Sequence, residues 1–284
     1  MMTGNLVGKI FGIALVFAII ASLVGGLTAL PLSNLRSPSQ VLADEVVTFP
    51  DPNLEAAIRE AINKTEGDIY QSDLDNLTSL DANIRNIIDL TGLEHCTSLT
   101  YLHLYYNQIS DISPVSNLTS LTYLHLGYNQ ISDISPLSNL TSLTDLYLYN
   151  NQISDISPVS NLTSLTKLYL RGNQISDISP VSNLTSLTVL GLEYNQISDI
   201  SPVSNLTSLT GLLLGSNQIS DIKPLVDNSG LGGGDEVDLR SNPLSATSLN
   251  TYIPQLEARG VIVYYDAPLD TTPPANVTLS LIHI

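Results

Sequence analysis

The sequence predicts an α/β solenoid, in which short coils of chain stack on one another and align their strands in one concave parallel β-sheet. A phrase of 22 residues that begins at Leu99 returns almost unchanged at 121–142, 143–164, 165–186 and 187–208. Within one phrase the apolar residues are separated by steps of 3, 2, 5, 3, 3 and 3, which fit neither a continuous helix nor a continuous strand. A fixed period of this kind indicates one structural unit stacked on itself.

Each unit opens with a short strand. At 101–105 apolar and polar residues alternate, so Leu102 and Leu104 point inward while Tyr101 and His103 point outward. An Asn follows each strand, and its side chain is expected to bond backbone groups of the turn and of the neighbouring coil. These residues are Asn107, Asn129, Asn151, Asn173, Asn195 and Asn217.

The return path of each coil contains a proline, which lacks a backbone donor and has a fixed φ angle. The column comprises Pro114, Pro136, Pro158, Pro180, Pro202 and Pro224. A long helix is therefore excluded there, and we expect short 3₁₀ or extended segments on the convex side.

The ends of a solenoid expose its core and need covering. The segment 49–63 is predicted to form an amphipathic helix, with Asp51 as N-cap and Pro52 at the first helical position. Its sealing side is expected to comprise Leu54, Ile58, Ala61 and Ile62. At the other end, 245–266 predicts a helix followed by a closing strand from Val261 to Tyr265.

The repeated pattern LxxLxLxxNxI resembles the leucine-rich repeat, and the variant N-Q-I-S-D-I-S-P-V-S-N-L-T-S-L is similar to the 22-residue type of bacterial internalin-like surface proteins. The resemblance covers about 77–265. It implies a right-handed array and a role in adhesion or protein recognition. Family binding residues are not transferred, because concave positions diverge freely.

The chain divides into five expected regions. They are a signal peptide or membrane anchor at 1–43, a helical cap at 44–76, about eight repeat coils at 77–244, a C-terminal cap at 245–266, and a linker at 267–284 to a further domain. The leader has Lys9 before an apolar run and a small-residue cleavage site ending at Ala43; cleavage near Ala29 and an uncleaved anchor stay open. We therefore expect a secreted or cell-surface protein.

The net charge of −17 disfavours binding to nucleic acid or to anionic membranes, and is compatible with cationic protein partners or divalent ions. The sequence contains no HExxH, GxSxG, phosphate-loop or CxxC motif, so we predict no enzymatic activity, no cofactor and no metal. The single Cys96 replaces a repeat leucine and is expected to be a small buried apolar residue.

Three repeated features have competing interpretations. His103 and His125 share a column, about 5 Å apart, and are expected to be exposed surface residues, with a metal or catalytic pair as the alternative. The Asp column that begins at Asp111 is expected to cap turns, with calcium binding as the alternative. The N-L-T triplets match the glycosylation sequon but follow from the repeat itself.

The outward strand positions change from unit to unit while the rest of each coil stays nearly constant. A scaffold that varies only along its concave sheet is suited to presenting that sheet to a partner, and tyrosine is enriched in such surfaces. The candidate ligand-binding residues are Tyr101, His103, Tyr105, Tyr123, His125, Asp145, Tyr147, Tyr149, Lys167, Tyr169, Arg171 and Glu193.

We expect a monomer that recognises an extracellular or host-surface protein, with the membrane contacted only through an uncleaved leader. Three alternatives stay open: glycan binding by the tyrosines, a spacer role in a larger surface enzyme, and ice binding by the regular threonine columns. A fourth reading takes the tyrosines only as good strand formers on a solvated face.

Overall fold

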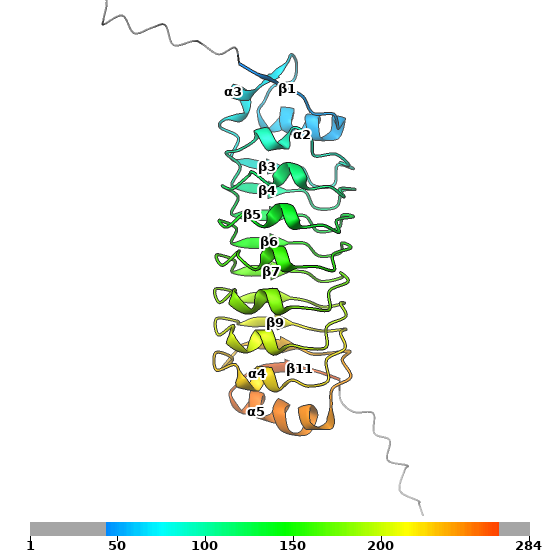
Figure 1. Cartoon of the computed structure of the whole chain (residues 1–284), viewed down its shortest axis with the longest axis vertical. Helices are drawn as coiled ribbons and strands as arrows, with labels where there is room; N and C mark the ends of the chain where they lie inside the picture. The colour runs from blue at the N-terminus through cyan, green and yellow to red at the C-terminus, as the bar shows by residue number, and fades with distance from the viewer. Residues whose placement is uncertain (1–43, 267–284) are drawn as a thin grey trace, which may run out of the picture. The chain divides into compact units, whose positions relative to one another are not determined.

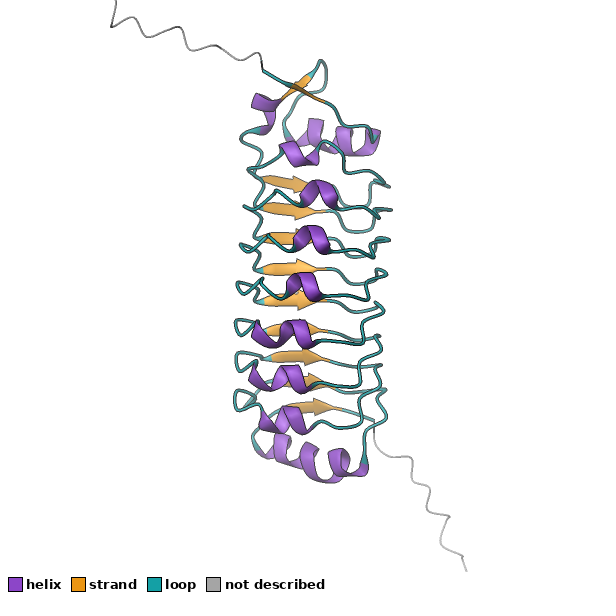
Figure 2. Cartoon of the chain, in the orientation of Figure 1, coloured by secondary structure: helices purple, strands orange, loops and turns teal. Residues whose placement is uncertain are grey.

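The computed structural model describes residues 44–266, so the expected leader at 1–43 and linker at 267–284 lie outside the described residues. Residues 44–266 form a stack of coils with one β-sheet along one face and short helical turns along the opposite face (Figure 1 and Figure 2). The predicted solenoid with a parallel sheet is therefore confirmed.

The main sheet has nine strands in sequence order, each paired in parallel with the next. They are β3 (Ser79–Asp81), β4 (Tyr101–His103), β5 (Tyr123–His125), β6 (Asp145–Tyr147), β7 (Lys167–Tyr169), β8 (Val189–Gly191), β9 (Gly211–Leu213), β10 (Glu236–Asp238) and β11 (Ile262–Tyr264). Leu102 pairs with Leu124, so equivalent positions of successive units lie side by side. The glycine-rich insertion lies between β9 and β10, where Leu212 pairs with Val237.

The inward leucines and isoleucines form one continuous core. Leu102, Leu124, Leu146 and Leu168 are 0% exposed, and Cys96 is buried in the position of a repeat leucine. Because each coil buries its apolar residues against the next, the core runs the length of the stack.

The asparagines after the strands bond as predicted. The Asn129 amide donates to the carbonyl oxygens of Leu104 and Leu126 at 3.0 and 3.1 Å, and its Oδ1 accepts from the Ile109 N–H at 3.0 Å. The same three bonds recur at Asn151, Asn173, Asn195 and Asn217. This asparagine ladder satisfies backbone groups that stacking would otherwise bury unpaired.

The convex face consists of short helical turns, as the prolines predict. They are η2 (Leu93–His95), η3 (Ser113–Val115), η4 (Ser135–Leu137), η5 (Ser157–Val159), η6 (Ser179–Asn183), η7 (Ser201–Asn205) and α4 (Lys223–Asp227). Asp111 accepts the Ser113 N–H at 2.8 Å and the Ser113 hydroxyl at 3.1 Å, and this arrangement recurs in the next four units. The Asp column therefore caps turns.

The N-terminal cap contains β1 (Val46–Val47), α2 (Pro52–Ala61), β2 (Ile69–Tyr70) and α3 (Gln71–Leu74). Asp51 caps α2 by accepting the N–H groups of Asn53 and Leu54, and its second oxygen accepts the N–H groups of Ile88 and Asp89. One carboxylate thus joins the cap helix to the first coil.

The buried side of α2 differs from the prediction at one position. Leu54 and Ile58 are 0% exposed and Ile62 is partly buried, as expected, but Ala61 is exposed and Ala57 is buried at 2% instead. Ala61 is the last residue of the helix.

The C-terminal cap begins with a π-helical turn, η8 (Ser248–Tyr252), that continues into α5 (Ile253–Ala258). Ile253, Leu256 and Val261 are buried against the last coil. The predicted closing strand is present as β11, one residue shorter at each end. Between residues 44 and 266, no helix is both long and apolar enough to cross a bilayer.

Candidate functional site

The outward side chains of β4 to β7, together with the tyrosines that lie two residues after β4 and β6, form one continuous aromatic surface, which we call the aromatic wall. It comprises Tyr101, His103, Tyr105, Tyr123, His125, Tyr147, Tyr149 and Tyr169. The in-register pairing of the strands produces this surface, because it places equivalent residues of neighbouring units in one column.

Ring stacking within the wall is tight and runs along the columns. Tyr101 stacks on Tyr123 at 4.5 Å between ring centroids, His125 on Tyr147 at 4.9 Å, and Tyr147 on Tyr169 at 5.0 Å, with planes within 12° of parallel. Aromatic contacts of this kind contribute roughly 0.5–1.5 kcal/mol each beyond area burial. The wall is therefore preorganised, with its ring faces already in contact with one another.

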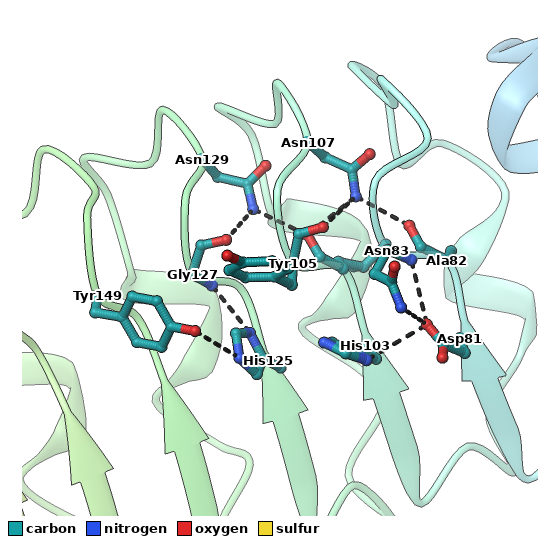
Figure 3. Close-up of polar contacts among 11 residues, drawn as sticks. Asp81, Ala82, Asn83, His103, Tyr105, Asn107, His125, Gly127, Asn129 and Tyr149 are labelled. Carbon is teal, nitrogen blue, oxygen red and sulfur yellow. Dashed lines mark hydrogen bonds and ion pairs between the residues drawn. The ribbon is translucent and has the colours of Figure 1, made fainter.

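His125 is fixed inside the wall, contrary to the expectation of an exposed residue, since only 8% of its surface is accessible. Figure 3 shows the Gly127 N–H donating to His125 Nδ1, at 3.3 Å, and Tyr149 Oη lying 3.1 Å from Nε2. The neutral ring with its proton on Nε2 matches these contacts. Burial, together with the neighbouring His103, lowers the pKa of His125 to about 4, so the ring is neutral at pH 7.

His103 lies in the same column, 4.7 Å from His125 between ring centroids, as the repeat spacing predicts. Its Nδ1 is 3.4 Å from Asp81 Oδ1, on the neighbouring strand β3 (Figure 3). Within residues 44–266, no three or more His, Cys, Asp or Glu side chains are grouped closely enough to hold a metal ion.

A charged pair borders the wall. Lys167 Nζ lies 3.0 Å from Asp145 Oδ1, across the β6–β7 pairing. The Lys167 side chain is 45% exposed, so this ion pair contributes little to stability and leaves the ammonium accessible.

Arg171 and Glu193 lie outside the wall, nearer the C-terminal cap. The Arg171 guanidinium lies over the Tyr194 ring, 4.9 Å from its centroid, whereas Glu193 is partly buried and its Oε2 atom has no hydrogen-bond partner. Burial raises the pKa of the Glu193 carboxyl, while the Arg171 charge acts in the opposite direction. The candidate residues thus divide between an aromatic and a charged region.

Sequence reasoning missed three charged residues of the same face. Asp81 comes before the regular repeats, and Asp238 and Arg240 come after the insertion, so none stands in a regular 22-residue unit. The pairing of Leu213 with Asp238 places Asp238 in the column of Gly191. An alignment through Leu239 and Asn242 would have identified these positions.

Short parallel strands, an asparagine ladder and convex 3₁₀ turns together define a leucine-rich repeat solenoid. The family model for leucine rich repeats (2 copies) matches residues 75–117, 97–139, 119–161, 141–183, 163–205 and 185–227. The crystal structure of internalin C2 from Listeria monocytogenes is 35% identical, covers 77% of this chain and 94% of that chain, and gives a TM-score of 0.69. The chain belongs to the internalin-like leucine-rich repeat proteins.

Two other structures show similarity. Internalin InlF from Listeria monocytogenes is 30% identical, with a TM-score of 0.40 over 77% of this chain and 91% of that chain. The ectodomain of the receptor kinase GASSHO1/SCHENGEN3 from Arabidopsis thaliana, in complex with CASPARIAN STRIP INTEGRITY FACTOR 2, shares the fold at 22% identity; its TM-score is 0.52, over 62% of this chain and 22% of that chain. A search of curated protein sequences matched none.

Proposed function

We propose that this chain is an exported, non-enzymatic recognition protein that docks an extracellular or host-surface protein on its aromatic wall. The observation that supports this most directly is the contrast between the scaffold and the wall. Core, asparagine and turn positions are nearly constant from unit to unit, while the outward strand positions vary and gather aromatic rings.

The physical basis of docking is preorganisation. Rings whose centroids are already 4.5–5.3 Å apart lose little conformational freedom when a partner covers them. Tyrosine presents a large apolar area together with a polar hydroxyl, which is typical of residues that contribute most of the binding energy of an interface.

The ring geometry favours a protein over a glycan as the ligand. Sugars bind aromatic residues mainly by lying flat on the ring face, but Tyr147 is stacked between His125 and Tyr169, and Tyr123 is stacked on Tyr101. Ring edges and hydroxyl groups therefore meet the ligand. The plant receptor ectodomain that shares this fold is in complex with CASPARIAN STRIP INTEGRITY FACTOR 2, which supports a recognition role for the chain.

Export and adhesion rest on the leader pattern and on family membership. Lys9 precedes an apolar run from Ile10 to Leu30, and the similar protein internalin C2 comes from a bacterium. Processing of the chain is testable by mass spectrometry of the mature protein after expression in a bacterial host; a mature start at Asp44 supports signal-peptide cleavage.

The docking proposal is tested on an array of extracellular protein domains and glycans, probed with wild type, Tyr147→Ala and Thr163→Ala. Thr163 is exposed in the turn between η5 and β7, outside the aromatic wall, and is the matched control. We expect a protein ligand whose affinity falls at least tenfold for Tyr147→Ala and stays unchanged for Thr163→Ala. A glycan ligand, or a protein ligand insensitive to Tyr147→Ala, would contradict the proposal.

A further inference from the structure

A polar hollow of about 360 Å³ opens on the concave face between the aromatic wall and the C-terminal cap. Its charged lining consists of Arg171, Glu193, Asp238, Arg240 and Asp266. Its volume falls within the range of roughly 300–1,000 Å³ that is usual for small-ligand sites.

The hollow arises because side chains are missing from the regular columns. Gly215 stands in the column of Arg171 and Glu193, so one coil between Glu193 and Arg240 contributes no side chain. A Cβ atom at Gly215 would lie 3.4 Å from the Arg240 carbonyl oxygen and 3.6 Å from the Asp238 carboxylate, so a side chain there would project into the hollow.

One acceptor in this region lacks a partner. Glu193 Oε2 is buried, and no hydrogen-bond donor reaches it among the residues that the structure describes. The Arg171 guanidinium, which could have paired with it, lies over the Tyr194 ring instead. An unpartnered carboxylate oxygen costs stability, and the N–H donors of a ligand in the hollow would recover that loss once the Glu193 side chain rotates to expose the oxygen.

The two arginines do not make the hollow an anion site. Arg240 donates to both oxygens of Asp238, at 2.9 and 2.6 Å, so each charge is neutralised by the other. An anion bound at Arg171 would face Glu193 and Asp266 in a chain whose net charge is −17. The electrostatic potential in the hollow, with Arg240 and Asp238 neutralising each other, therefore favours a cation.

We propose that this hollow receives a lysine or arginine side chain of the protein docked on the aromatic wall, with Glu193 as its hydrogen-bonding counter-ion. The inference rests on the proposed function in taking the cation to be part of a docked protein. A partner would then lay apolar residues on the wall and place a basic residue beyond it, toward the C-terminal cap.

The test uses a ligand fragment, so that it does not depend on knowing the partner. N-acetyl-arginine amide is titrated into the isotope-labelled full chain, and the amide signals of Gly191 and Gly215 are followed by NMR. N-acetyl-citrulline amide, which has nearly the same shape without the charge, is the matched probe. We expect arginine to bind about tenfold more tightly than citrulline, with shifts at both glycines.

Two variants assign the effect to the hollow. Glu193→Gln retains the shape of the side chain and should abolish the preference for arginine over citrulline. Gly215→Leu fills the hollow without changing charge and should abolish binding of both probes. Tyr147 lies outside the hollow, so Tyr147→Ala should leave arginine binding unchanged. Failure of the hollow proposal can therefore be told apart from failure of the docking proposal.

The inference is overturned by any of three results: no arginine binding to wild type at 50 mM probe, equal affinity for arginine and citrulline, or a preference for arginine that survives Glu193→Gln. Circular dichroism of each variant confirms that the solenoid is intact before titration.

Discussion

Replacing Asn173 by alanine tests how the stack satisfies its buried backbone. The Asn173 side chain accepts the Ile153 N–H at 3.0 Å and donates to the carbonyl oxygens of Leu148 and Leu170 at 3.0 and 2.9 Å. The residue is 9% exposed and lies between two intact coils, so water has little access to these groups. Asn173→Ala would leave one donor and two acceptors without their partner.

The magnitude follows from those three groups. Each buried polar group that loses its partner costs about 1 kcal/mol at the low end of measured values, which gives a loss of about 3 kcal/mol in the free energy of unfolding.

Urea unfolding followed by circular dichroism measures the loss, with Asn161→Ala as the control. Asn161 belongs to an N-L-T triplet of the neighbouring coil and is exposed, so its replacement should change the free energy of unfolding by less than about 0.5 kcal/mol. Equal stabilities of the two variants would refute the argument that the ladder holds the coils together.

Three other predictions concern single positions. Gly172→Ala should cost about 1–2 kcal/mol in unfolding free energy, because φ is +67° and the added Cβ would clash with Asn150 Oδ1. Thermal unfolding measures this loss, with Gly211→Ala as the control because a Cβ there meets only ordinary contacts. Asp51→Ala should cost about 2 kcal/mol at pH 7. Burial raises the pKa of Asp51, but four backbone N–H groups hold it below 3.8. In urea unfolding at different pH values, the difference in unfolding free energy between wild type and Asp51→Ala should therefore shrink only when the pH falls below 3.8. Glu193→Gln should stabilise the protein by about 1 kcal/mol at pH 8. Burial raises the pKa of Glu193 in the native state above 4.5, so wild type loses stability as the pH rises from 4.5 through the native pKa. The gain should vanish near pH 4, and a variant that is no more stable than wild type at pH 8 would contradict the prediction.

Much of the scaffold was predictable because its physics is local and repeats. The alternation around Leu102 and Leu104 specifies a strand, Asn107 a turn, and Pro114 a short convex segment. The cap helix was predictable from Asp51 and Pro52 for the same reason. In each case the deciding interactions lie within a few residues or one repeat apart.

The details of the site were less predictable because they depend on three coils at once. His125 is buried by rings from its own and adjacent strands and by its contact with Gly127, and no spacing rule reveals that. The residue before each ladder asparagine has a positive φ, as Tyr106 and Tyr128 show. Only Asn150 and Gly172 are of residue types that commonly adopt a positive φ, so the sequence alone does not predict this backbone conformation for the whole column.

The hollow illustrates the same limit. Its position depends on an absent side chain at Gly215 and on Asp238, which reaches this column only after the insertion. Sequence reasoning identified Arg171 and Glu193 as outward-facing residues, and the contact that separates Arg171 from Glu193 became visible only in three dimensions.

The exact pairing of each residue with its counterpart 22 positions later has an evolutionary consequence. Loss or duplication of one whole unit would join two equivalent turns and leave every bond between neighbouring coils intact. Such an event would move the hollow relative to the aromatic wall by one interstrand distance, about 4.8 Å. Recombination between near-identical repeats could thus change the distance between the two proposed contact regions without altering the residues of either one.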